Sequence, residues 1–166
     1  LGRVESDKGL HNIIELIPDC EDIKFEIWGN GTSQYISELE KIASMRNNRN
    51  IHMMGLAAKS DIPKIMKGAM FSIIPSAWHD NLPNSLIESL SNGVPVIAPN
   101  YGCFTEFISH EYNGFLYNSS DELKEIFNNI MLLNSESKKK LSINATMYAK
   151  ETFNSKIHID KLLNVF

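Results

Sequence analysis

Short apolar segments alternate with longer amphipathic segments along almost the whole chain. The apolar segments predict strands over residues 24–28, 51–54, 71–74, 95–98 and 114–117. Helical spacing of apolar side chains predicts helices over residues 33–46, 60–67, 84–92 and from 121 nearly to 166, with breaks around Asn134 and Asn154. Strands that alternate with helices are typical of parallel sheets. The pattern therefore predicts an α/β fold, a Rossmann-like, doubly wound parallel sheet in a three-layer α/β/α sandwich.

Composition places the chain among globular proteins. Of its 166 residues, 43% are hydrophobic and 22% are charged, which predicts one domain over residues 1–166. The formal net charge of −4, with no basic run beyond residues 138–140, argues against a nucleic-acid partner. Cys20 and Cys103 lie far apart, which fits a reducing compartment, and no apolar run is long enough to span a membrane. We therefore expect a cytoplasmic protein.

Ligands of such a sheet bind beyond the carboxyl ends of its strands, so the polar residues that follow each strand are candidates. Arg3 and Lys8 flank a loop that enters a helix near Lys8 or Gly9, and both side chains can bind phosphate there. Two ordinary surface cations are the alternative. Gly29 and Gly31 follow a strand and let backbone approach a ligand closely, although a plain turn explains them equally well. They do not form a G-x-G-x-x-G dinucleotide motif.

The segment from Pro75 to Glu88 is the most informative. A strand ends at Pro75, a loop carries Asp80, and a helix begins near Asn84. Backbone N–H groups at such a helix start bind anions, and the carboxylates of Asp80 and Glu88 accept hydrogen bonds from sugar hydroxyls. A loop turn at Asp80 and a solvated helix position at Glu88 are the structural alternatives. A further cluster, residues 100–106, again places a glycine and a carboxylate, Glu106, after a strand.

Taken in order, these clusters resemble a known family. The chain contains G-R-x4-K-G, then G-x-G, then P-S-x-W-x-D-N-x-P-N-S-x-x-E, then G-V-P-V-I-A, then G-x-x-x-E. This order is similar to the carboxy-terminal half of retaining glycosyltransferases of GT-B architecture, family GT4. The resemblance runs from Gly2 to the late helices and is most specific between Pro75 and Glu106. It implies a nucleotide-sugar-binding domain whose amino-terminal, acceptor-binding partner domain is absent from this chain.

The resemblance implies catalytic roles for Arg3, Lys8 and Asp80, and substrate-binding roles for Glu88 and Glu106. Arg3 and Lys8 match the basic pair that neutralises the donor diphosphate as the nucleotide departs. Asp80 falls at the first position of an E-x7-E motif, where the family has a glutamate on the donor sugar. Glu88 falls at the second position, which holds the ribose hydroxyls. Glu106 matches the glutamate of G-G-x-x-E, in which Cys103 replaces the second glycine.

The remaining binding roles rest on backbone. Residues 54–56 would line the base pocket, and the amides of residues 82–85 would bind phosphate or sugar. The expected substrate-binding set is Glu88, Gly29, Gly31, Met54, Gly55, Leu56, Asn81, Leu82, Pro83, Asn84, Ser85 and Glu106.

No metal or cofactor is expected. The chain has no D-x-D pair, and its histidines lack ligand spacing, so His79 is interpreted as polar surface. The resemblance likewise implies chemistry without a bound metal, with the NDP-sugar as a substrate rather than a cofactor.

The leading hypothesis is the donor-binding half of a hexosyltransferase-like enzyme that moves a sugar from an NDP-sugar to a bacterial polysaccharide or glycolipid acceptor. The sequence does not decide the nucleotide (UDP, GDP or ADP), and the resemblance adds peripheral association with the inner face of the membrane.

The alternatives are a non-catalytic sugar-nucleotide-binding domain of the same fold, suggested by Asp80 and Cys103, and a nicotinamide-dependent oxidoreductase, which the missing glycine motif disfavours. The opening Leu1-Gly2-Arg3 predicts a fragment of a longer protein, with trimming of a disordered terminus as the alternative. A stripe of final apolar side chains is expected to pack against the absent domain: Ile157, Leu162, Leu163 and Phe166.

Overall fold

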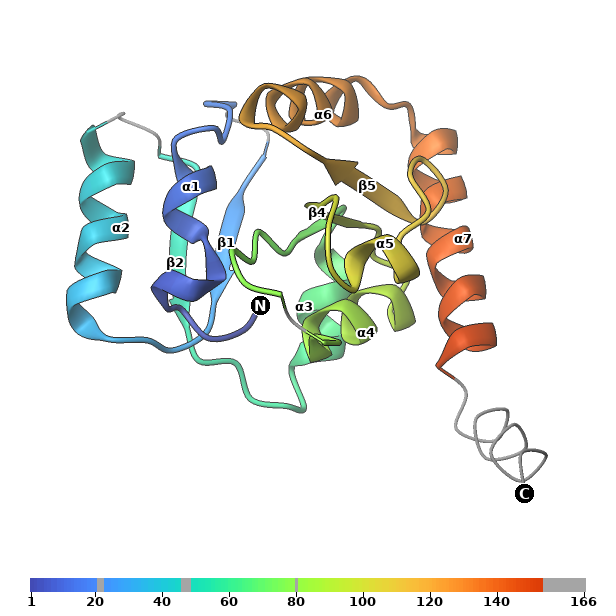
Figure 1. Cartoon of the computed structure of the whole chain (residues 1–166), viewed down its shortest axis with the longest axis horizontal. Coiled ribbons are helices and arrows are strands. Elements are labelled where there is room, and N and C mark those ends of the chain that lie inside the picture. The colour runs from blue at the N-terminus through green and yellow to red at the C-terminus, as the bar shows by residue number, and fades with distance from the viewer. Residues whose placement is uncertain (21–22, 46–48, 80, 154–166) are drawn as a thin grey trace.

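The computed structural model of the protein describes residues 1–20, 23–45, 49–79 and 81–153. Its strands are β1 (Phe25–Trp28), β2 (Ile51–Gly55), β3 (Ser72–Ile73), β4 (Val96–Pro99) and β5 (Gly114–Tyr117). Its helices are a 3-10 helix (Ser6–Lys8), α1 (Leu10–Ile14), α2 (Ser33–Met45), α3 (Ile62–Gly68), α4 (Asn84–Ser91), α5 (Phe104–Phe107), α6 (Ser120–Leu132) and α7 (Ser135–Thr152). Strands and helices alternate through most of the chain (Figure 1), which confirms the predicted α/β class.

The strands are parallel and form two sheets rather than the single sheet that we predicted. One sheet pairs β1 with β2, and the other has the order β3-β4-β5. The start of the chain lies beside the carboxyl end of β1. There Gly2 N–H donates to Trp28 O over 2.9 Å, and Val4 N–H donates to Asn30 O over 2.9 Å. Strand pairing between distant segments cannot be read from periodicity, because each strand has the same apolar pattern whichever neighbour it takes.

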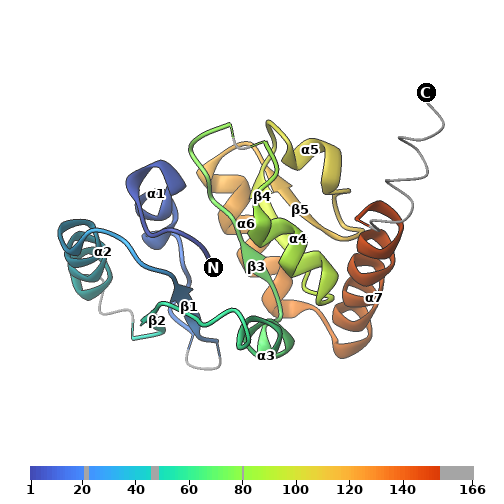
Figure 2. The ribbon, with the colours of Figure 1, turned by 90° about the horizontal axis from the view of Figure 1, so that it is seen from below.

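Helices cover both faces of the three-stranded sheet (Figure 2). Successive side chains of β4 point to opposite faces. Val96 and Ala98 pack in one core with α4, α5 and α7. Ile97 packs on the other face with α6 and with Ile13 of α1. This sandwich is the predicted three-layer arrangement.

The two-stranded sheet is covered differently. Phe25 and Ile27 pack toward a core formed by α1 and α2, including Ile14 and Leu39. Between them Glu26 points outward and accepts a hydrogen bond from the exposed indole of Trp28. A strand that is apolar on both faces, as parallel sheets typically have, is therefore found at β4 and not at β1.

The helix ends have identifiable causes. Ser119 caps α6 by accepting from Glu122 N–H over 3.2 Å, and Asn134 caps α7 by accepting from Ser137 N–H over 2.8 Å. The predicted break near Asn134 is thus the start of a new helix. The predicted helix after residue 121 is confirmed as far as Thr152. The expected break near Asn154 and the terminal apolar stripe lie outside the described residues.

Short helices were the elements most easily missed. Sequence analysis placed a helix start near Lys8 or Gly9, where α1 begins at Leu10, but it did not predict α5. With four residues, α5 is too short to show a helical period. Within the described ranges, the structure has no helix long and apolar enough to cross a membrane.

Candidate functional site

Four loops at the carboxyl ends of the strands are joined by backbone hydrogen bonds. Gly2 N–H donates to Trp28 O over 2.9 Å, and Gly29 N–H donates to Gly55 O over 2.8 Å. On the side of the larger sheet, Ala77 N–H donates to Asp7 O over 3.1 Å. The segments that sequence analysis picked out separately after β1 and β3 therefore meet at the loop of residues 2–9, and the end of β2 is joined to them through Gly29.

The predicted cationic pair lies in that loop. The Arg3 side chain is 67% exposed, and its Nη2 donates to Oδ2 of Asp7 over 3.0 Å. Lys8 is half-buried at the end of the 3-10 helix. Sequence analysis missed Asp7, although it lies four residues after Arg3, a spacing that favours ion pairs on helical turns. Its carboxylate competes with any phosphate for the Arg3 guanidinium.

Gly29 and Gly31 have a structural reason to be glycine. A Cβ on Gly29 would overlap Gly2 O, and a Cβ on Gly31 would overlap Val4 O. Gly29 also has φ at 151°, which a side chain rarely adopts. These glycines let the chain approach its own amino-terminal segment, and their contact with a ligand stays a prediction.

The start of α4 offers backbone donors. Pro83 is the N-cap residue, with extended backbone and no side-chain cap hydrogen bond. Within the described part of the chain, the backbone N–H groups of Asn84 and Ser85 donate no hydrogen bond to the protein. Such donors, with the positive end of the helix dipole, suit an anion. Asn81 and Leu82 are exposed just before them, and Asp80 lies outside the described residues.

Glu88 lies one turn further along α4, where it is half-buried. Burial lowers the pKa of the Leu1 amino group, and the negative charge of Glu88 opposes that shift. The Glu88 carboxylate thus lies near the Leu1 amino group, two residues before Arg3. At the end of β2, Met54 and Leu56 are exposed and form an apolar surface. Gly55 lies between them at φ 74°, with open space where its Cβ would be.

Cys103 and Glu106 have different environments in the structure, one buried and the other exposed. Cys103 is the N-cap residue of α5 at φ −62°, and its side chain is buried in the core shared by α4, α5 and α7. Glycine is therefore not needed at this position, and the thiol packs in the protein interior. Glu106 is exposed on α5, and its backbone carbonyl accepts from the Tyr148 hydroxyl over 3.1 Å.

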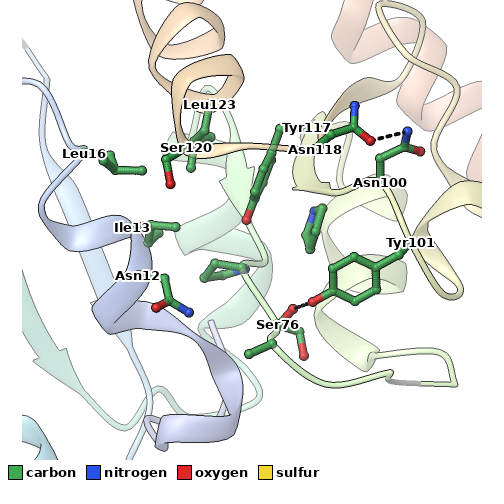
Figure 3. A pocket seen from close by; sticks show the side chains of 13 residues that line it. Asn12, Ile13, Leu16, Ser76, Asn100, Tyr101, Tyr117, Asn118, Ser120 and Leu123 are labelled. Atoms are coloured by element: carbon green, nitrogen blue, oxygen red, sulfur yellow. Dashed lines mark hydrogen bonds between the residues drawn. The ribbon is translucent and has the colours of Figure 1, made fainter.

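A cavity of about 350 Å³ lies at the same edge of the larger sheet, on the side of α1 and α6 (Figure 3). It is lined by residues that follow β3, β4 and β5, among them Ser76, Asn100 and Asn118. The Tyr117 hydroxyl points into it from the end of β5. Sequence analysis considered polar residues after the other strands but overlooked Tyr117 and Asn118, which the same rule would have found.

Metal chemistry has no evident centre here. Among the residues that the structure describes, no group of three or more His, Cys, Asp or Glu side chains is placed to hold a metal ion. His79 is exposed and its ring packs against Tyr101, with ring centroids 5.1 Å apart.

Cations, free helix amides and carboxylates at the carboxyl edge of parallel strands define an α/β domain suited to a phosphorylated ligand. Comparison with known proteins identifies the family: residues 1–147 match the glycosyl transferases group 1 model, and the chain belongs to that family. Spore coat protein SA of Bacillus subtilis is 22% identical over 178 residues, covering all of this chain and 47% of that protein. The chain therefore spans about half the length of that relative.

Solved structures agree on the fold. HepE of Anabaena in complex with UDP superposes with a TM-score of 0.87 at 23% identity, over 99% of this chain and 48% of that chain. The C-terminal domain of LpcC, a glycosyl transferase group 1 family protein of Francisella tularensis, superposes with a TM-score of 0.79 at 20% identity, over 93% of this chain and 84% of that domain. These likenesses establish a Rossmann-like domain of the kind found in GT-B glycosyltransferases.

Proposed function

We propose that this chain is the carboxy-terminal, donor-binding half of a retaining glycosyltransferase of family GT4, and that it holds an NDP-sugar at the carboxyl edge of its strands. The observation that carries the proposal is the meeting of the predicted clusters at the loop of residues 2–9. Backbone hydrogen bonds tie this loop to the end of β1 and to the segment after β3. Glu88 on α4 interacts with the charge of the Leu1 amino group, which directly precedes this loop.

The diphosphate is assigned to the part of this edge that carries Arg3 and Lys8. Arg3 is exposed, Lys8 lies five residues on, and the N–H groups of Asn84 and Ser85 begin α4. Guanidinium, ammonium and helix amides each stabilise phosphate oxygens. As the glycosidic bond to the nucleotide breaks, negative charge grows on the leaving diphosphate, and preformed donors lower the barrier to its departure.

The nucleoside is assigned to the neighbouring carboxylate and apolar surface. Glu88 would accept from the ribose hydroxyls, and residues 54–56 at the end of β2 would border the base. HepE was solved with UDP and with UDP-glucose, which supports UDP as the first nucleotide to test. Asp80 and Glu106 are assigned to the donor sugar on the family resemblance.

The partner half of the enzyme would supply the acceptor site. The LpcC domain is a free-standing C-terminal domain of similar extent, which supports assigning residues 1–166 to the same half. The acceptor, a polysaccharide or glycolipid, would bind across the cleft on the amino-terminal domain. The reaction would use no metal, and the whole protein would work in the cytoplasm, at the inner face of the membrane.

Calorimetric titration with UDP, GDP and ADP tests the proposal. We expect one of them to bind, and Arg3→Ala or Lys8→Ala to weaken that binding about tenfold or more, because charge-assisted hydrogen bonds contribute roughly 1.5–3 kcal/mol each. Lys139→Ala removes an equal charge from exposed α7 and should change little. The free nucleoside should bind all variants alike.

Two outcomes would contradict the proposal. One is that no nucleoside diphosphate binds. The other is that Lys139→Ala weakens binding as much as Arg3→Ala, since the attraction would then be nonspecific. Transfer by the full-length protein distinguishes an enzyme from a domain of the same fold that only binds the nucleotide.

A further inference from the structure

The cavity beside α1 and α6 has the chemistry of a site for a neutral ligand. Its lining consists of apolar, hydroxyl and amide side chains, and no charged side chain takes part. Its volume of about 350 Å³ is near the small end of the range for ligand pockets, which is roughly 300–1,000 Å³. A small neutral molecule therefore matches it better than a nucleotide or a phosphate.

One hydroxyl in the cavity has no protein partner in the described part of the chain. Tyr117 contributes its backbone carbonyl to Asn100 N–H over 2.8 Å, but its side-chain hydroxyl makes no hydrogen bond to a described residue. Burial raises the pKa of Tyr117, and the nearby Tyr101 raises it further, so the phenol stays neutral. Figure 3 shows this hydroxyl near the middle of the cavity, with the side chains of Asn12 and Ser120 on the same wall. A ligand hydroxyl can donate to the phenol or accept from it.

The amide groups at the rim are held in place. Glu122 accepts from both the backbone N–H and Nδ2 of Asn118, over 2.7 and 2.9 Å. The Asn118 Oδ1 in turn accepts from Nδ2 of Asn100 over 2.9 Å. This chain of hydrogen bonds holds Asn100 and Asn118 in place at the rim of the cavity. Opposite these amides, Ile13, Leu16 and Leu123 form an apolar wall.

A fixed set of hydroxyl and amide groups facing an apolar wall matches one ligand class, a pyranose ring, which has hydroxyls at its edge and C–H groups on its faces. The cavity is also next to the proposed donor site. In its wall, Ala77 donates its backbone N–H to Asp7 O, in the loop of Arg3 and Lys8. Helix α4 packs on one face of the sheet, whereas α1 and α6 pack on the other. The diphosphate site and the cavity thus flank the same edge from opposite faces.

We propose that this cavity binds a neutral sugar ring of the acceptor, brought beside the donor at the carboxyl edge of the sheet. The proposal rests on the function proposed above and adds to it, because it places part of acceptor recognition on this half of the enzyme. The ring's hydroxyls would bond Tyr117 and Asn12, and its apolar face would rest on Ile13 and Leu16.

An NMR titration of the isotope-labelled chain tests this, with glucose, galactose and N-acetylglucosamine as probes. A lone monosaccharide should bind in the millimolar range and shift the signals of Tyr117, Asn118 and Ser120. Tyr117→Phe removes only the hydroxyl and should weaken binding about threefold to tenfold. Tyr112→Phe, on a half-exposed tyrosine that does not line the cavity, is its matched control and should leave binding unchanged.

Asn12→Ala should weaken sugar binding like Tyr117→Phe, whereas Asn128→Ala, on the exposed side of α6, should not. UDP affinity, measured on the same samples, should stay the same in all of these variants. If UDP bound to none of the samples, the proposed function would be contradicted, and the acceptor role with it.

The inference has its own refutations. It is overturned if none of the sugars shifts the cavity signals, or if Tyr117→Phe and Tyr112→Phe behave alike. It is also overturned if UDP-glucose displaces the free sugar and UDP does not, because the cavity would then hold the sugar of the donor.

Discussion

Replacing Asp7 with asparagine should strengthen UDP binding. The Asp7 carboxylate lies 3.0 Å from the Arg3 guanidinium in the free protein. To bind the diphosphate, Arg3 must therefore weaken or break its ion pair with Asp7. Asparagine keeps the size of the side chain and removes its charge. The backbone hydrogen bond from Ala77 N–H to Asp7 O is unaffected by the change.

The size of the gain follows from the exposure of the pair. At 3.0 Å, two unit charges in water attract by about 1.4 kcal/mol before entropy and salt are counted. The side chains are 67% and 37% exposed, and exposed pairs typically contribute about 0.2–1 kcal/mol. Releasing Arg3 should therefore tighten UDP binding by a factor of about 1.4–5. Removing a negative charge near the diphosphate adds a smaller gain, which salt screens.

A double-mutant cycle separates these two contributions. Calorimetry would measure UDP affinity for the original chain, Asp7→Asn, Arg3→Ala and the double variant. The gain from Asp7→Asn should shrink when Arg3 is already alanine, and uridine affinity should not change. Asp121→Asn is the control, because it removes a carboxylate from another exposed ion pair of 3.0 Å, with Lys124.

Two results would refute the reasoning. If Asp7→Asn weakened UDP binding, Asp7 would be orienting Arg3 for the ligand rather than competing with it. If the gain were equal with and without Arg3, the ion pair would play no part in it.

Other consequences are open to measurement. Glu88→Gln should weaken UDP binding about tenfold while leaving the melting temperature nearly unchanged; equal affinity of the unaltered chain for ribose and dideoxyribose nucleotides would contradict the role assigned to Glu88. Gly31→Ala should destabilise the fold by about 1–3 kcal/mol because its Cβ overlaps Val4 O, whereas Gly68→Ala, with open space around it, should be neutral or slightly stabilising; denaturant unfolding compares them. The chain alone should bind UDP without transferring sugar, because transfer needs donor and acceptor held in one geometry; product formed by the purified chain would contradict this.

The elements with strong local patterns were predictable from the sequence. The strand at Gly114–Tyr117 has the predicted bounds, and α4 begins at the predicted Asn84. In both cases the apolar pattern changes abruptly at a glycine or proline, so the end is marked locally. The predicted helix start at residue 60 was wrong, since Asp61 is the N-cap residue and α3 begins at Ile62.

The arrangement of the sheet was not predictable in the same way. Whether β1 pairs with β3 depends on contacts between distant segments. The cavity falls in the same class, because Asn12 and Tyr117 come from segments more than a hundred residues apart. Periodicity gives no information about such pairs. The rule that ligands bind beyond strand ends would have pointed to this cavity if we had applied it to β5.

The glycines after β1 illustrate why a motif alone does not define a site. A glycine indicates that something approaches the backbone closely, and ligand and protein are equally good candidates. At Gly29 and Gly31 the approaching group is the backbone of residues 2–4, which also carries Arg3. The glycines therefore act on the proposed phosphate site through the position of this loop. It follows that substitutions of these glycines should alter stability and UDP affinity together, whereas substitutions of the Arg3 and Asp7 side chains should alter affinity alone. A Gly31→Ala chain that kept full stability but lost UDP binding would instead place Gly31 in direct contact with the ligand.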